Sequence, residues 1–348
     1  MTEPGSGSSV RVGAIDCGTN SIRLLVADIS PSGVLSDVLR RMEVVRLGYG
    51  VDRTGRIDPV AMERTLVMAR EYAGQCVELG VSAVRFVATS ASRDASNAGE
   101  FVAGVVEAFA AFGVVPEVVS GDEEAGLSFR GATGDVAGAG VAGPYLVVDL
   151  GGGSTEFVRG SASVEAVRSV DIGCVRMTER HLVSDPPTVD EVAAATRDID
   201  AAIDLAVETV GFCDVRALVG LAGSVTTVTA HAIGLPAYDP SRIHLAVTPA
   251  RRLRAAAREL LAMTRAERAG LGFMHPGRVD VIGAGGLVWD RVIDRVQRET
   301  GLGDELVVVT SEHDILDGIA LGVADRLSQE LSGADRGRPG ADPGLTRG

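Results

Sequence analysis

The sequence predicts an α/β protein made of two similar domains. Its 348 residues suggest two domains rather than one. Strand-like apolar runs alternate with helix-like segments along most of the chain, as they do in α/β proteins. A unit of strand, Asp, Gly turn and strand near the N-terminus recurs near residue 145, so the chain contains an internal repeat.

The first half opens with a hairpin. The strand at 11–16 runs into the Gly-containing turn Cys17–Ser21 and then into a second apolar run, Ile22–Ile29. A helix is expected at Pro59–Leu79, because Asp58 suits the N-cap, Pro59 suits the first turn and Gly80 suits the end. The elements expected next are a strand at Val84–Ala88, a helix at Gly99–Phe112, a strand at Val114–Val119 and a helix at Asp122–Arg130.

The second half repeats the opening of the first. A Gly/Ala loop is expected at 133–144, with the domain boundary near its start. The strand Tyr145–Asp149 then leads through Gly151–Gly153 into the strand Thr155–Val158. The helix at Thr188–Val210 carries acidic residues that predict a solvated face. Residues 1–9 and 331–348 are rich in Gly, Ser and Pro, and we expect both tails to be disordered.

Composition disfavours several classes of function. The formal net charge of −14 disfavours general nucleic-acid binding. No apolar run is long enough to cross a membrane and no signal peptide is visible, and the four cysteines form no CxxC pair. Together these features predict a cytoplasmic protein with reduced thiols. All 33 basic residues are Arg, so cationic phosphate contacts would come from planar, bidentate guanidinium groups.

The two turns carry the chemistry. The first reads DCGTNS at 16–21 and the second reads DLGGGSTE at 149–156. Gly lets backbone N–H groups approach phosphate oxygens, and Ser, Thr and Asn add side-chain donors. Asp149 and Glu156 flank the second turn and suit a divalent cation. One Gly hairpin is ordinary structure, but one in each half favours a phosphate site.

Other residues leave alternatives open. A carboxylate beside such a phosphate site could orient or deprotonate a water molecule, and Asp122, Glu123 and Glu124 are not distinguished by the residues alone. Arg23 lies on a strand two residues past Ser21, and its direction stays open. His313 is interpreted as structural, and the remaining histidines are too scattered for a metal cluster: His181, His231, His244 and His275.

Five further segments carry a family resemblance. They are ATSASRDASNA (88–98), SGDEEAGLSFRGA (120–132), GLAGSVTT (220–227), VIGAGG (281–286) and SEHDILDGIALG (311–322). With the two turns, they make residues 10–325 resemble the exopolyphosphatase and guanosine-pentaphosphate phosphatase family, closest to its short two-domain members. The resemblance implies two actin-like (ribonuclease H-like) domains around a cleft. Its C-terminal helix would return to the first domain, so domain I is expected at 10–132 plus 311–330 and domain II at 133–310.

The resemblance also implies the roles of individual residues. Glu124 matches the catalytic carboxylate, and Asp149 and Glu156 match the metal ligands. The implied cofactor is a divalent cation, Mg²⁺ with Mn²⁺ as the alternative. From the resemblance and from the turns together, the candidate phosphate-binding residues are Asn20, Ser21, Arg93, Gly151, Gly152, Gly153, Ser154, Gly223, Ser224 and Arg176.

The expected activity is release of orthophosphate from the end of inorganic polyphosphate. The alternative substrate is guanosine pentaphosphate (pppGpp), which calls for the same motifs. A superfamily kinase or ATPase is disfavoured because no inserted substrate domain is visible. A non-catalytic nucleotide sensor is disfavoured because it would have little need of all three acids, Glu124, Asp149 and Glu156. A homodimer remains an open alternative.

Overall fold

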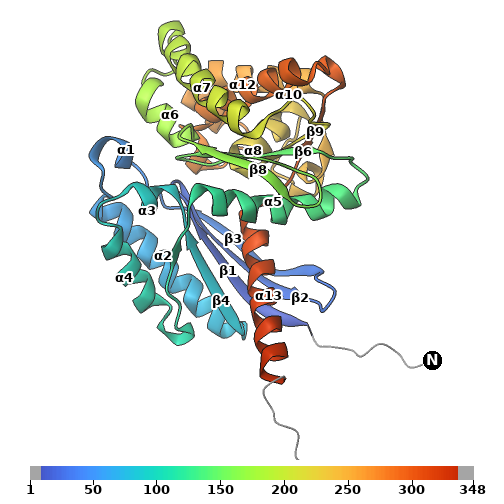
Figure 1. Ribbon diagram of the computed structural model, residues 1–348. Helices are drawn as coiled ribbons and strands as arrows, with labels where there is room; N and C mark the ends of the chain where they lie inside the picture. Colours follow the sequence, from blue (N-terminus) through green and yellow to red (C-terminus); the bar gives the residue numbers. More distant parts are fainter. Residues whose placement is uncertain (1–8, 336–348) are drawn as a thin grey trace, which may run out of the picture.

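The computed structural model describes residues 9–335 and shows two α/β halves, one above the other in Figure 1. The lower half contains a five-stranded sheet in the order β3-β2-β1-β4-β5, and the upper half a six-stranded sheet in the order β10-β11-β9-β6-β7-β8. Both orders confirm the α/β class. The described part of the chain contains no helix with the length and apolar character needed to span a bilayer.

The first sheet begins with the predicted hairpin. β1 and β2 are antiparallel, β2 and β3 are antiparallel, and β4 and β5 run parallel to β1. The strands are β1 (Val10–Cys17), β2 (Ser21–Ile29), β3 (Leu35–Val44), β4 (Ala83–Ala88) and β5 (Glu117–Val118). The helices of this half are α1 (Val51–Thr54), α2 (Pro59–Glu78), α3 (Ser90–Asp94) and α4 (Ala98–Ala108), followed by the 3₁₀ turn η1 (Ala110–Phe112).

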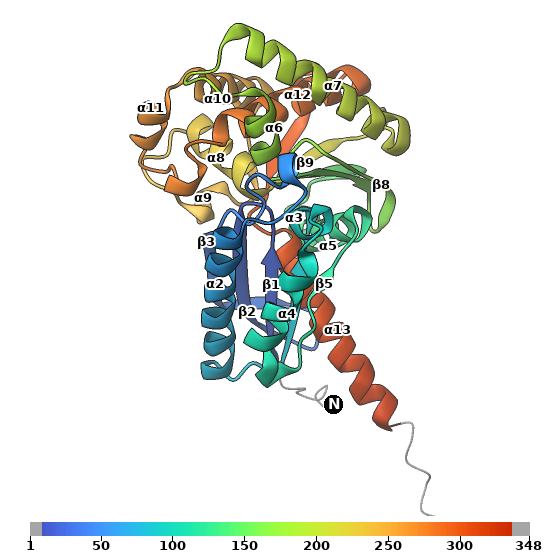
Figure 2. The ribbon, with the colours of Figure 1, turned by 90° about the vertical axis from the view of Figure 1, so that its left-hand side faces the viewer.

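Successive side chains of a strand point to opposite faces of the sheet, and in this sheet both faces carry apolar side chains. Ile15, Ile22 and Leu24 pack towards α2 and α4, while Val12 and Leu25 pack against the C-terminal helix α13 (Ile315–Asp335). The predicted return of this helix to the first half is therefore seen in the structure: Figure 1 shows α13 in front of the lower sheet, and Figure 2 shows it on the side of that sheet opposite α2.

The second sheet repeats the first. Read from its edge, β8-β7-β6-β9-β11 has the same order as β3-β2-β1-β4-β5, which confirms two halves of the actin-like type. An extra strand, β10, is added antiparallel to β11. The strands are β6 (Tyr145–Leu150), β7 (Thr155–Gly160), β8 (Val164–Val170), β9 (Ala217–Leu221), β10 (Ala246–Val247) and β11 (Val307–Thr310).

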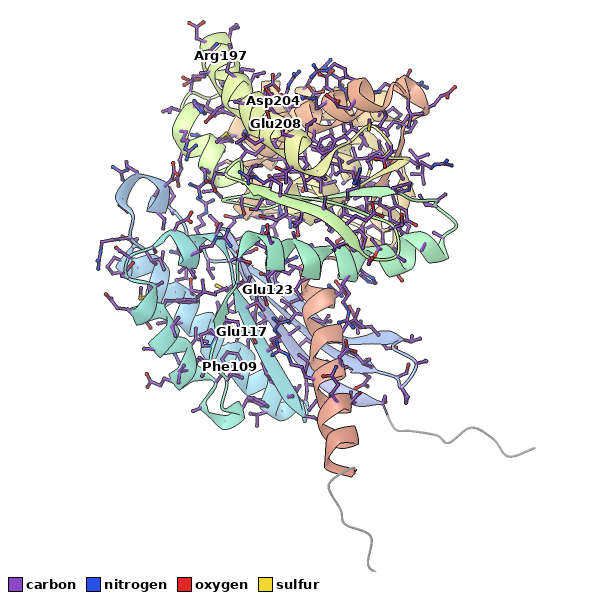
Figure 3. The ribbon with its side chains drawn as sticks, in the orientation of Figure 1. Phe109, Glu117, Glu123, Arg197, Asp204 and Glu208 are labelled. Carbon is purple, nitrogen blue, oxygen red and sulfur yellow. The ribbon has the colours of Figure 1, made fainter. Side chains whose placement is uncertain are left out.

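Helices cover both faces of the second sheet. One face packs against a large core contributed mainly by α7, α8, α10 and α12. The elements of this half are α6 (Cys174–His181), α7 (Val189–Val210), α8 (Ala222–Ala232), α9 (Pro240–Ile243), α10 (Ala250–Ala262), α11 (Arg265–Ala269), η2 (Pro276–Arg278), α12 (Ile282–Thr300) and η3 (Gly303–Glu305). The predicted solvated face of α7 is seen in Figure 3, where Arg197, Asp204 and Glu208 lie on its outer side.

The helix α5 (Gly121–Gly138) covers the other face of the second sheet. Its Ala125, Phe129 and Ala132 pack against the buried side chains of β6, β7 and β9. It also crosses α13 closely, because a Cβ atom on Gly131 would lie 1.9 Å from the carbonyl oxygen of Asp314. α5 thus connects the second sheet with the helix that returns to the first.

Several predicted bounds need correction. The Gly/Ala loop expected at 133–144 is wrong at its start, because α5 continues to Gly138 and buries Val136. A domain boundary at 132/133 falls inside this helix, so we propose to move it to the segment 139–144. The strand expected at Val114–Val119 is only Glu117–Val118. Helix α13 continues through 331–335, which were expected to be disordered, and residues 1–8 and 336–348 lie outside the described residues.

Candidate active site

The two glycine turns of the repeat face each other where the two sheets meet. A Cβ atom on Gly152 would lie 3.0 Å from the Cβ of Thr19 and 3.3 Å from the backbone nitrogen of Asn20. A Cβ atom on Gly153 would lie 2.4 Å from the Oγ of Ser90. Only Gly allows the second turn to approach the first so closely, so the structure brings the two turns together.

A cavity of about 100 Å³ lies between the turns. The predicted site residues that line it are Asn20, Ser21, Glu124, Asp149, Gly151, Gly152, Ser154, Gly223 and Ser224. The predicted residues that do not line it are Arg93, Gly153, Glu156 and Arg176. Most of the implied phosphate-binding set is thus assembled from both halves of the chain.

The N-terminus of α8 forms a third side of this cavity. Ala222 has a left-handed backbone, with φ 68°, and it turns the chain from β9 into the helix. Gly223 and Ser224 then present the first turn of α8 to the cavity. The first N–H groups of a helix lack intrahelical partners and carry partial positive charge, so this end suits a phosphate group.

Two buried carboxylates lie behind the second turn. Asp149 ends β6 and accepts a 2.5 Å hydrogen bond from Ser128, and Glu156 on β7 accepts a 2.8 Å hydrogen bond from Ser169. Burial, with the neighbouring Asp314, raises the pKa of Asp149 to about 7. Burial, with Asp149 beside it, raises the pKa of Glu156 to about 8. Without a cation, the protein therefore disfavours ionisation of both groups.

Glu124 approaches the same place from the first turn of α5. Burial raises its pKa well above the usual range, and the charge of Glu156 raises it further. Arg93 lies beside it, with Nη1 3.3 Å from the carboxylate and 2.9 Å from the carbonyl oxygen of Val119. Arg93 thus contacts the catalytic candidate instead of lining the cavity.

The structure distinguishes the three neighbouring acids of α5. Asp122 is exposed. Glu123 pairs with Arg85 at 3.1 Å, on the side of the first sheet where Glu117 also lies (Figure 3). Of the three, only Glu124 lines the cavity.

The donors at this site fit a divalent cation. The charges of Glu156 and Asp149 raise the pKa of Glu124, and the charge of Asp149 raises the pKa of Glu156, so these carboxylates are close enough to repel. Carboxylate oxygens are the ligands that Mg²⁺ and Mn²⁺ prefer, and a cation between them would relieve this repulsion.

Arg23 is a cavity residue that the sequence reasoning left open. It lines the cavity, pairs with Asp16 at 2.7 Å and also contacts Asp314 at the start of α13. The sequence could have predicted this position, because Ser21 and Arg23 are two residues apart on β2 and therefore point to the same face of the sheet. No such pattern predicted the contact of Asp314 with Arg23, because the two residues are 291 positions apart in the sequence.

Arg278 is a cavity residue that the sequence reasoning missed. It lies at the end of the short turn η2 and packs over Gly223, where a Cβ atom would be 2.4 Å from the guanidinium carbon. Its Nη1 donates a 3.2 Å hydrogen bond to Thr227. No recognisable motif surrounds this residue, and its position depends on packing between η2 and α8.

Arg176 does not face the cavity. Its Nε donates a 2.7 Å hydrogen bond to the carbonyl oxygen of Gly153, and its Nη2 pairs with Asp94 at 2.6 Å. Its remaining nitrogen contacts Asp52. With its donors engaged in this way, Arg176 supports the second turn from behind, and its predicted direct contact with phosphate has no support in this geometry.

A second, larger compartment adjoins the cavity. Its volume is about 430 Å³, and the two compartments share Arg23, Met42, Ala222, Gly223 and Arg278 in their walls. The larger one adds cationic Arg40 and Arg41 and several apolar or aromatic side chains. These are Tyr238, Phe273, Met274, His275 and Leu316. The small cavity suits one phosphate group, and the larger compartment has room for the rest of a substrate.

The chain is similar to known proteins over most of its length. Residues 25–317 match the model of the Ppx/GppA phosphatase family. Exopolyphosphatase 2 of Mycobacterium tuberculosis is 49% identical over 319 residues, which cover 90% of this chain and 98% of that protein.

Solved structures are also similar to this chain. An exopolyphosphatase-like protein superimposes with a TM-score of 0.88 at 45% identity, covering 92% of this chain and 100% of that one. The Ppx/GppA family member of Aquifex aeolicus superimposes with a TM-score of 0.73 at 30% identity, covering 92% and 99%. The family model and the 49% identical relative both match most of the chain. The chain therefore belongs to the Ppx/GppA phosphatase family.

Proposed function

We propose that this protein is an exopolyphosphatase, which hydrolyses the terminal phosphoanhydride bond of inorganic polyphosphate and releases orthophosphate. The observation that carries the proposal is the position of Glu124, Asp149 and Glu156 beside a cavity formed by two phosphate-type turns. Its relative in Mycobacterium tuberculosis is named Exopolyphosphatase 2. The free cysteines, three of them buried, fit the proposed cytoplasmic location.

The residues have complementary roles in this reaction. The turn at 151–154 and the N-terminus of α8 bind the terminal phosphate through backbone N–H groups and the hydroxyls of Ser154 and Ser224. Glu124 accepts a proton from water as the water oxygen attacks the terminal phosphorus, and the bridging P–O bond breaks towards the remaining chain. Burial raises the pKa of Glu124, which makes its ionised carboxylate a stronger base than an exposed one.

Asp149 and Glu156 are the proposed ligands of a divalent cation, Mg²⁺ or Mn²⁺. When bound, the cation would neutralise phosphate charge and keep these carboxylates ionised. Arg23 and Arg278 supply fixed positive charge along the wall shared by the two compartments. These two arginines let an acidic protein hold a polyanion, because the attraction acts locally and the overall repulsion is screened by salt.

A second candidate substrate is guanosine pentaphosphate. The observation that favours it is the larger compartment, where Tyr238, Phe273 and His275 could contact a nucleobase while phosphates occupy the small cavity. Polyphosphate would instead use Arg40 and Arg41 in the same space.

One set of assays tests the proposal. Phosphate release should be measured from short polyphosphate, long polyphosphate, guanosine pentaphosphate and ATP with one enzyme preparation and with its Glu124→Gln variant. We expect polyphosphate to have the highest kcat/KM, and the variant to lose activity on every substrate. Hydrolysis of guanosine pentaphosphate with no release from polyphosphate would assign the alternative substrate.

A further inference from the structure

A second group of potential metal ligands lies outside the active site. Within the described residues, Asp135, His244 and His313 place one ligand atom each within 4.8 Å of one another. Asp135 is on α5, His244 follows α9, and His313 is in the loop between β11 and α13. The four histidines predicted to be too scattered for a cluster, among them His244, are not brought together, but His244 lies beside His313, which the sequence analysis treated separately as structural.

The distances suit a small coordination site. Nδ1 of His313 is 2.5 Å from Oδ2 of Asp135, and Nε2 of His244 is 3.6 Å from the same oxygen. The two imidazole ring centroids are 4.4 Å apart. Ligands at about 2.0–2.1 Å from a tetrahedral ion are roughly 3.4 Å from one another. The His244 contact already has this spacing, and the His313 contact has to widen by about 1 Å.

The protonation state of His244 also suits metal binding. Burial, with the neighbouring His313 ring, lowers the pKa of His244, which favours the neutral imidazole that metals bind. The side chain of Asp135 is 46% exposed and that of His313 is 34% exposed. An ion can therefore reach the group, and water can complete its coordination.

The surrounding charges do not oppose a cation. The charged groups that face His244 besides this cluster are Asp317 and Arg40. These two pair with each other at 2.5 Å, so Asp317 offsets part of the repulsion between Arg40 and a cation at this site. The carboxylate of Asp135 then sets the local charge.

We propose that Asp135, His244 and His313 bind a transition-metal cation of the Zn²⁺ class, with water as the fourth ligand. Two imidazoles and one carboxylate suit Zn²⁺, Co²⁺ or Ni²⁺ better than Mg²⁺, which takes oxygen ligands. The site is separate from the carboxylates beside the phosphate turns.

Binding at this site has a structural consequence for the active-site loop. The backbone N–H of Glu312 donates a 3.3 Å hydrogen bond to Nδ1 of His244, which leaves the ring proton on Nε2. A metal at Nε2 moves that proton to Nδ1, so the contact with Glu312 opens. Glu312 accepts a hydrogen bond from Tyr238 in the larger compartment, and Asp314 pairs with Arg23 in the small cavity. The ion would therefore adjust the loop that completes both compartments.

Cobalt absorption tests the site directly. The chelator-treated protein is titrated with Co²⁺ in saturating Mg²⁺, and the visible absorption is recorded. Four-coordinate Co²⁺ with imidazole ligands absorbs far more strongly than the six-coordinate, oxygen-bound ion. We expect one equivalent of this strong absorption, displaced by Zn²⁺. Asp135→Asn, His244→Gln and His313→Gln should each abolish it or weaken Co²⁺ binding by at least about tenfold.

The controls separate this site from other metal sites. His181→Gln is the matched variant, because His181 also contacts an Asp and its side chain is 21% exposed, against 23% for His244. It should keep the absorption, and so should Asp149→Asn. Absence of the strong absorption, or its loss in Asp149→Asn but not in the histidine variants, would overturn the proposal. Asp135→Asn alters an exposed group on α5, so its unchanged melting temperature without metal shows that its fold is retained.

Discussion

Ser128 on α5 donates a 2.5 Å hydrogen bond to Asp149 at the end of β6. Ser128 is four residues after Glu124, so both side chains lie on the same face of the helix. One helix face thus presents the candidate catalytic carboxylate and supports a candidate metal ligand. This pairing keeps the same face of α5 towards the second turn, in agreement with the packing of Ala125 and Phe129 on the second sheet.

Ser128→Ala is expected to shift the pH dependence of activity. The hydrogen bond from Ser128 stabilises ionised Asp149 and lowers its pKa, so its loss raises that pKa further. Because Asp149 must be ionised to hold the cation, the acidic limb of the kcat/KM profile should move to higher pH. Ser169→Ala, which removes the matching donor to Glu156, should shift it in the same direction. Unchanged profiles in both variants would contradict this role of the serines.

Glu124→Gln should reduce kcat by roughly 10²–10⁴-fold, the usual contribution of general acid–base catalysis, with little change in substrate binding. The amide cannot accept the proton from water. Glu123→Gln is the matched control, since Glu123 is one residue away but pairs with Arg85. Single-turnover rates and equilibrium binding of polyphosphate check both variants. Equal losses of kcat in the two would remove the special role of Glu124.

Asp149→Asn and Glu156→Gln should raise the metal concentration that gives half-maximal activity, because each removes a proposed charged ligand. The measurement is a Mg²⁺ titration of initial rates at saturating polyphosphate. Glu179→Gln offers a control carboxylate in the second half, since Glu179 accepts from the backbone N–H of Gly50 instead of lying at the cavity. Unchanged metal dependence in both test variants would place the cation elsewhere.

The metal-free protein should lose stability as pH rises from about 4 to about 8. Unfolded Asp149 and Glu156 ionise near their ordinary values of 3.8 and 4.5, whereas in the folded protein their pKa values are about 7 and about 8. Between these limits the folded state binds more protons than the unfolded state, so the free energy of unfolding falls with pH.

Denaturant unfolding at several pH values measures this slope, and Asp149→Asn with Glu156→Gln should flatten it. Mg²⁺ should stabilise the protein more at pH 8 than at pH 6, because it binds the ionised carboxylates; at 100 times its Kd a ligand adds about 2.7 kcal/mol. A slope that the double variant leaves unchanged would assign the effect to other groups.

Arg278→Gln should raise KM for polyphosphate and weaken its dependence on salt. Arg278 contributes to the wall of both compartments, and charge–charge attraction there is screened as ionic strength rises. Arg242→Gln on α9 is the control, because Arg242 is exposed and lines neither compartment. The measurement is KM at several salt concentrations. The same increase in KM for both variants would indicate a general charge effect.

The lengths of the polyphosphate chains left after partial hydrolysis show whether the enzyme is processive. The two substrate compartments among the described residues are small, with volumes of about 100 Å³ and about 430 Å³, so a long chain makes few contacts in them. We expect short or moderate polyphosphate to be favoured and long chains to dissociate between cleavages. Under limiting enzyme, the whole population should then shorten together. Intact long chains beside free phosphate, from a proven monomer, would contradict this expectation.

Local sequence patterns were sufficient for the two turns and for a well-capped element such as α2. Asp58, Pro59 and Gly80 predict the bounds of α2 because capping depends on neighbouring residues. The Asp–Gly hairpins were predictable for the same reason, since a glycine turn between two apolar runs is a local signal. The repeat of this unit then predicted two similar halves, which the strand orders confirm.

The sequence by itself therefore determined the α/β class, the repeat and the pair of phosphate turns. Tertiary structure alone decided which acid of α5 enters the cavity, because the rotation of α5 is set by Ala125, Phe129 and Ala132 packing on the second sheet. It also decided that Arg278 lines the cavity, that Asp314 pairs with the cavity residue Arg23, that Arg176 turns away from the cavity, and that His244 meets His313. These contacts join residues far apart in the chain, and such contacts depend on how whole helices and sheets pack, which no local pattern encodes.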